Sequence, residues 1–92
     1  MKGSIFIVDD DADHLSALAD LIETSGHEVQ AFASAKAALD AMDARPDLVI
    51  SDLRMPQMDG IAFLNALRAQ NISVPVVLLT GHGDVSHAVE AM

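Results

Sequence analysis

Apolar residues occur along this chain in two alternating patterns. In some stretches they follow one another without a break, which predicts buried strands, and in others they recur every three or four positions, which predicts helices. The short run 28–32 is partly polar, which predicts a strand at the edge of the sheet. Alternation of strand and helix is typical of a parallel sheet with helices on both faces, so the pattern predicts an α/β fold. The expected strands are 4–8, 28–32, 47–52 and 74–80, and the expected helices follow residues 11, 34, 59 and 84.

Each expected helix is preceded by a residue whose side chain can cap the first turn. These caps are Asp11, Ser34, Asp59 and Asp84. Helical spacing then predicts the residues that face the core. They are Leu15, Leu18, Ala19 and Ile22 in the first helix, Ala35, Ala38, Leu39 and Met42 in the second, Ile61, Leu64 and Leu67 in the third, and Val85, Ala88, Val89 and Met92 in the fourth.

Polar side chains stand where three of the apolar runs stop. Asp9 and Asp10 follow the first strand, Asp52 ends the third, and Thr80 ends the fourth. The carboxyl ends of parallel strands line up at one edge of the sheet, where ligands bind, so these side chains should converge. Carboxylates beside a hydroxyl favour a hard cation and a phosphoryl group.

Composition narrows the class of protein. The 92 residues allow one domain, and an apolar fraction of 51% is enough for a core. A net charge of −9 argues against direct binding to nucleic acid or to an anionic membrane. We also expect a cytoplasmic protein, because the chain has no cysteine, no leader-like start and no run that could span a bilayer.

Four motifs in this order and spacing resemble one family: the acid pair after the first strand, the lone Asp52 before Leu53-Arg54-Met55-Pro56, the Met58-Asp59-Gly60 turn, and Thr80-Gly81-His82-Gly83-Asp84. The chain resembles the receiver domain of two-component response regulators, most of all receivers attached to sigma-54 activators and related transcription factors. The resemblance implies a flavodoxin-like, doubly wound parallel sheet of order 2-1-3-4. Residues 1–92 resemble one receiver domain that stops within the expected fourth helix. The family's fifth strand, the Lys on that strand and the fifth helix are therefore missing.

The resemblance also implies roles for particular residues. Asp52 would be the phosphoacceptor, and Thr80 would contact the phosphoryl group and act as a switch. Mg²⁺ would be held directly by Asp10 and Asp52, mainly through water by Asp9, and by the backbone carbonyl of Arg54. A sensor histidine kinase would be the phosphodonor, and an output or DNA-binding domain would lie elsewhere in a longer chain. Apart from self-phosphorylation and self-dephosphorylation at Asp52, no conventional enzyme activity is implied.

Alternatives remain from the residues alone. Asp52 could simply cap a turn, and the acid pair could be a helix N-terminus. The domain could be a phosphorylation-independent interaction module, because no Lys after Lys36 could replace the family's Lys. A Mg²⁺-dependent phosphohydrolase is a less favoured alternative, because Arg54 stands where the general acid of such an enzyme is expected. The chain should self-associate. The expected routes are pairing at the edge of its uncharged fourth strand, packing of the apolar face that the family's fifth helix would cover, or exchange of its last helix.

The four histidines carry weaker signals. His14 and His27 are expected at exposed positions. His82, Asp84 and His87 could be drawn as a metal set, but a loop residue, a helix cap and a surface position are the favoured interpretation.

Overall fold

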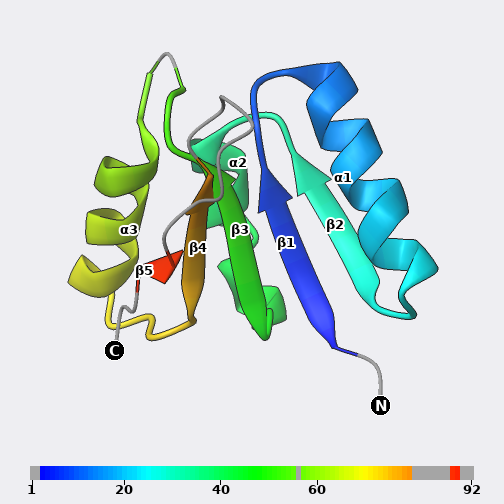
Figure 1. The fold of residues 1–92 in the computed structure, drawn as a ribbon. Helices are drawn as coiled ribbons and strands as arrows, with labels where there is room; N and C mark the ends of the chain where they lie inside the picture. Colours follow the sequence, from blue (N-terminus) through cyan, green and yellow to red (C-terminus); the bar gives the residue numbers. More distant parts are fainter. Residues whose placement is uncertain (1–2, 56, 80–87, 90–92) are drawn as a thin grey trace.

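A sheet with helices on both sides forms the protein (Figure 1). The computed structural model describes residues 3–55, 57–79 and 88–89. The strand order is β2-β1-β3-β4-β5. In chain order the elements are β1 (Ser4–Val8), α1 (Ala12–Thr24), β2 (Glu28–Phe32), α2 (Ala35–Asp40), the 3₁₀ turn η1 (Met42–Ala44), β3 (Leu48–Asp52), α3 (Gly60–Ala69), β4 (Val76–Leu79) and β5 (Ala88–Val89).

The first four strands are parallel, which confirms the predicted fold class and the order 2-1-3-4. The predicted third and fourth strands begin one and two residues too early, at 47 and 74. The predicted caps of the first three helices are also confirmed. Asp11 accepts hydrogen bonds from the first turn of α1, Ser34 from that of α2, and Asp59 from that of α3.

Residues Ala88 and Val89 correct the sequence analysis, which placed them in a fourth helix. They form β5, which pairs antiparallel with β4 through Val76 and Val77. Small and β-branched residues fit either element, and pairing with an open strand edge decides between them here. The prediction that β4 is a sheet edge is therefore wrong for the first half of that strand. The other residues expected in that helix lie outside the described residues.

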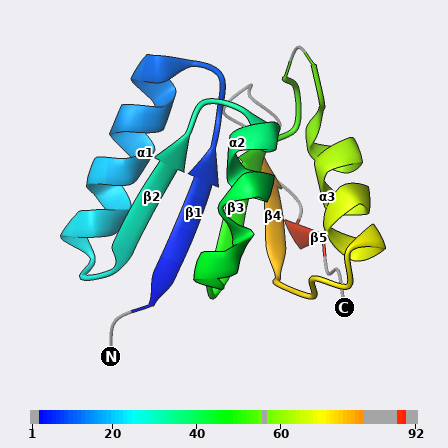
Figure 2. The same cartoon turned by 180° about the vertical axis from the view of Figure 1, so that it is seen from behind.

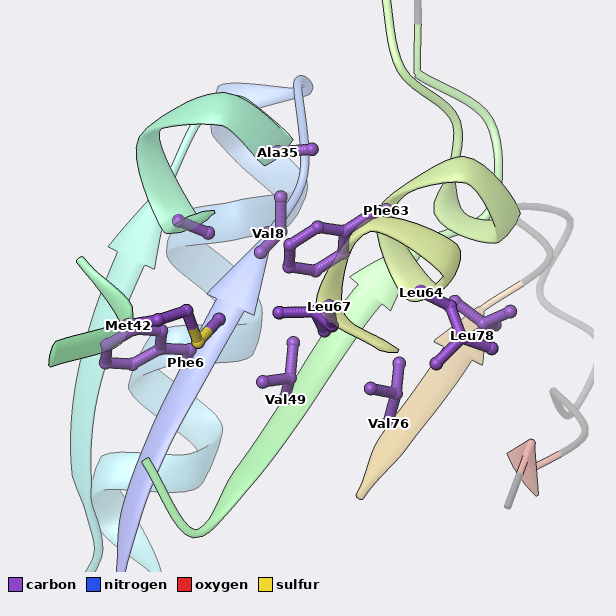
Figure 3. Packing of buried hydrophobic residues seen from close by; sticks show 11 residues of the cluster. Phe6, Val8, Ala35, Met42, Val49, Phe63, Leu64, Leu67, Val76 and Leu78 are labelled. Carbon is purple, nitrogen blue, oxygen red and sulfur yellow. The ribbon is translucent and has the colours of Figure 1, made fainter. Parts of the chain in front are cut away.

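The main core lies between the sheet and the helices α2 and α3 (Figure 3). Alternate residues of the strands point into it, as the pleat of a strand requires. Seen from behind, α2 lies in front of the sheet (Figure 2). The buried residues of this cluster are Phe6, Val8, Ala35, Ala38, Met42, Val49, Phe63, Leu64, Leu67, Val76 and Leu78.

Helix α3 differs from its prediction in one position. Ile61, expected to face the core, is 46% exposed, whereas Phe63 is completely buried. The buried stripe runs through Gly60, Phe63, Leu64 and Leu67, which is the i, i+3, i+4, i+7 pattern. Ile61 lies to one side of that stripe.

The other face of the sheet carries α1, which packs on β1 and β2. Ile5 and Ile7 are buried there, outside the main cluster. No residue of α1 is fully buried, and its predicted core positions Leu15, Leu18 and Ile22 are only partly covered. Within the described part of the chain, no helix has the length and apolar character needed to cross a bilayer.

Candidate functional site

Strand register brings the predicted acidic residues to one level of the sheet. In the parallel ladder between β1 and β3, Val8 lies opposite Ser51. The next residues along the two strands, Asp9 and Asp52, are therefore side by side at the carboxyl edge. Leu79, the last described residue of β4, lies opposite Asp52.

Three carboxylates meet at this edge. Asp9, Asp10 and Asp52 each place an oxygen within 4.8 Å of the other two. Asp9 is buried, Asp52 is half-buried and Asp10 is exposed, so the cluster opens to solvent on one side. The structure thus brings together all three acidic residues that the sequence analysis selected.

Asp9 is held from several directions. Its backbone N–H donates to the carbonyl of Phe32 at 3.0 Å, which ties the end of β1 to β2. Its Oδ1 accepts from the backbone N–H of Asp11 at 2.9 Å, and its Oδ2 contacts Nδ1 of His14. The side chain is 1% exposed. A buried carboxylate needs such partners, because an unpaired one is costly.

The pKa of Asp52 is raised above its ordinary value of 3.8. Burial is the main cause, followed by the negative charge of Asp9, with a smaller contribution from Asp10. Hydrogen bonds from the backbone of Arg54 and Leu53 act in the opposite direction. Burial and the two neighbouring acids together outweigh these hydrogen bonds, so the pKa of Asp52 stays raised.

Gly60 lets α3 begin directly against the end of β3. Its N–H donates to the carbonyl of Leu53 at 2.8 Å. A Cβ at this position would lie 2.8 Å from the carbonyl oxygen of Asp52 and 2.9 Å from Cδ2 of Leu78. The close approach of α3 to the end of β3 therefore requires a glycine here. A left-handed backbone angle is not the reason, since Gly26 is the glycine with a positive φ among the described residues.

The donor set fits a hard divalent cation. All three side chains offer carboxylate oxygens, and Mg²⁺ is usually held by one or two carboxylates together with waters and phosphate oxygens. A cation here would also offset the repulsion that raises the pKa of Asp52. The three carboxylates are therefore suited to Mg²⁺.

Other predicted positions have mixed outcomes. Thr80, Pro56, His82, Asp84 and His87 lie outside the described residues, and the structure does not test the carbonyl of Arg54 as a ligand. Met55 and Met58, from the segment between β3 and α3, pack beside the main core.

The predicted exposure holds for one of the two remaining histidines. His27 is half-buried, and its Nδ1 accepts a hydrogen bond from the backbone of Gly3 at 3.3 Å. His14 is exposed as predicted, at 44%, yet its ring also contacts Asp9. Its position gave a usable signal, because side chains in the first turn of a helix lean back toward the residues before it.

Fold and site together define an α/β domain of the flavodoxin-like class with an acidic cluster at the carboxyl edge of its sheet. The family profile described as "Response regulator receiver domain" matches residues 5–92. The chain belongs to this family.

Named relatives are transcriptional regulators. The chain is 45% identical over 92 residues to "Transcriptional regulatory protein FixJ" of Bradyrhizobium diazoefficiens, covering 99% of this chain and 45% of that protein. It is 43% identical to "C4-dicarboxylate transport transcriptional regulatory protein DctD" of Rhizobium meliloti, covering 97% of this chain and 20% of that protein. The chain thus spans less than half the length of these two relatives.

Solved structures agree with the fold. The crystal structure titled "FixJ-N" superposes with a TM-score of 0.83 at 37% identity, covering 92% of this chain and 69% of that one. The chemotaxis protein CheY4 of Vibrio cholerae superposes with a TM-score of 0.82 at 29% identity, covering 91% of this chain and 72% of that one.

Proposed function

We propose that this receiver domain takes a phosphoryl group from a phosphohistidine donor onto Asp52, with Mg²⁺ bound by Asp9, Asp10, Asp52 and the backbone carbonyl of Arg54. The observation that carries the proposal is the meeting of three carboxylates within 4.8 Å at the end of β3. Membership of the receiver family supports the same chemistry. The donor is a sensor histidine kinase, and the cytoplasm is the expected compartment.

In the transfer, a carboxylate oxygen of Asp52 forms a bond to phosphorus while the phosphorus–nitrogen bond of the donor breaks. The leaving imidazole nitrogen takes up a proton from solvent. Carboxylates act as nucleophiles of this kind in other phosphoryl-transfer proteins. Mg²⁺ held by Asp9, Asp10 and Asp52 would offset the negative charge that gathers on the phosphoryl oxygens.

The chain's own residues position the nucleophile. Ser51, fully buried, donates through its hydroxyl to the carbonyl of Asp52 at 3.0 Å, and the N–H of Leu53 donates to the carbonyl of Leu79 at 2.8 Å. These contacts hold the backbone on both sides of Asp52, so the carboxylate is presented from a rigid strand end. By resemblance, Thr80 contacts the transferred group and relays its arrival.

The domain therefore acts as a switch for an output domain in a longer chain. The two relatives named above are transcriptional regulators, which supports an output in transcription. DNA binding would belong to that output domain, since this chain carries a net charge of −9.

Acetyl phosphate provides the direct test. Incubation with acetyl phosphate and Mg²⁺ should add the mass of one phosphoryl group, and borohydride trapping should map it to Asp52. Asp52→Asn should abolish the adduct. Asp20→Asn, which removes an exposed carboxylate from α1, should retain it, as should Thr80→Ala.

Other outcomes would overturn the proposal. No adduct in the folded protein would favour a phosphorylation-independent interaction module. Rapid release of phosphate without an adduct would favour a Mg²⁺-dependent phosphohydrolase.

A further inference from the structure

We propose that His14 is a positioning residue that fixes the Asp9 carboxylate for cation binding. The inference rests on the metal site proposed above and adds to it a residue of a different chemical type. Its basis is the contact between Nδ1 of His14 and Oδ2 of Asp9, at a carboxylate that is 1% exposed.

The geometry at the start of α1 places His14 beside Asp9. Asp11 caps α1 by accepting from the backbone N–H groups of Asp13 at 3.0 Å and His14 at 3.2 Å. The backbone of His14 is thereby fixed at the start of the helix. Because helical side chains lean toward the N-terminus, its ring reaches back to the end of β1, where Asp9 lies.

The two oxygens of Asp9 have different partners. Oδ1 accepts from the N–H of Asp11 at 2.9 Å, and Oδ2 contacts the ring of His14. Each oxygen keeps a second lone pair. One carboxylate can thus be held by α1 and still offer an oxygen to the cluster with Asp10 and Asp52.

The contact needs only a donor at Nδ1. Neutral imidazole with its proton on that nitrogen supplies one. An aliphatic side chain at position 14 would leave Oδ2 of a buried carboxylate without this partner, and the carboxylate would be free to turn. Loss of such an outer hydrogen bond typically weakens metal binding about 10–100-fold.

Mg²⁺ titration by calorimetry of four proteins tests the inference: the unaltered chain, His14→Leu, His14→Asn and Asp10→Asn. Leucine removes the donor but keeps bulk. The amide nitrogen of asparagine occupies roughly the place of Nδ1 and can donate. We expect the affinity for Mg²⁺ to fall about tenfold or more in His14→Leu, and His14→Asn to recover most of that loss.

The variants separate failure of the inference from failure of the metal site. If Asp10→Asn binds Mg²⁺ as tightly as the unaltered chain, the proposed site itself is wrong. If Asp10→Asn loses binding while His14→Leu keeps it, or if His14→Asn is as weak as His14→Leu, the positioning role of His14 is wrong. Should His14→Leu fail to fold, His14→Ala takes its place in the same comparison.

Discussion

At the scale of single residues, Gly60 has the least space for a side chain among the described glycines. A methyl group there would press on the carbonyl of Asp52, which is backbone and cannot swing aside. Overpacking of this kind typically costs about 1–3 kcal/mol. We therefore expect Gly60→Ala to lower the free energy of unfolding by about that amount, as measured by urea denaturation.

Asn65 provides the control on the same helix. It is exposed, so Asn65→Ala should change stability by no more than about 0.5 kcal/mol. Equal free energies of unfolding for the two variants would mean that α3 can move away from β3 without loss of stability.

Asp52 makes stability depend on pH. In the unfolded chain its carboxyl has the ordinary pKa of 3.8, and in the folded protein burial and Asp9 raise that pKa. Because the folded protein holds this proton more tightly, the stabilising contribution is present below the ordinary pKa and is lost as the pH rises through the raised pKa. Ionised Asp52 therefore destabilises the metal-free protein at neutral pH.

Asp52→Asn should accordingly be more stable than the unaltered chain at pH 7 without metal, and the gain should shrink as the pH approaches 3.8. Urea denaturation in EDTA at several pH values measures this. Asp20→Asn changes the net charge equally at an exposed site. Equal gains in both variants would trace the effect to overall charge instead of to the site.

At the scale of elements, the strands that form the site were predictable. The predicted bounds of β1 and β2 agree with the structure, because each run is bounded by residues that stop a strand or cap a helix. The convergence of Asp9 and Asp52 followed from parallel topology alone. These features depend on local sequence and on one general rule of sheet geometry.

The features that sequence did not reveal depend on contacts between elements. Ala88 and Val89 are compatible with a helix until β4 offers them an edge. Phe63 and Ile61 are two residues apart, and the face that α3 turns toward the sheet decides which one is buried. His14 acts through Asp9, a contact across the β1–α1 turn that no apolar pattern records.

Helix α3 allows a direct test of its corrected face. Phe63 is fully buried in the main core, so Phe63→Ala should cost about 3–5 kcal/mol. Ile61→Ala, two residues earlier, should cost much less, because that side chain is 46% exposed. Thermal or urea denaturation compares them. Similar losses would support the original prediction that Ile61 faces the core.

At the scale of the whole molecule, the two faces of the sheet differ in how well the described elements cover them. The face under α2 and α3 holds the main core. On the opposite face α1 packs on β1 and β2. By strand alternation, this second face includes the apolar residues of β3 and β4 that are only half-buried, namely Leu48, Ile50, Val77 and Leu79.

Apolar side chains that are left partly exposed together on one face favour association. We expect the 92-residue chain to self-associate through this face. Pairing at the edge of β4 is a weaker route, since β5 already covers Val76 and Val77. The net charge of −9 opposes contact between copies, so association should strengthen as salt screens this charge.

Sedimentation equilibrium at several protein and salt concentrations measures the self-association. Leu48→Lys, which places a charge on the face, should weaken association, whereas Ile61→Lys, on α3 at the opposite face, should leave it unchanged. A single monomeric species at every concentration, or equal effects of the two lysines, would show that this face is not the contact.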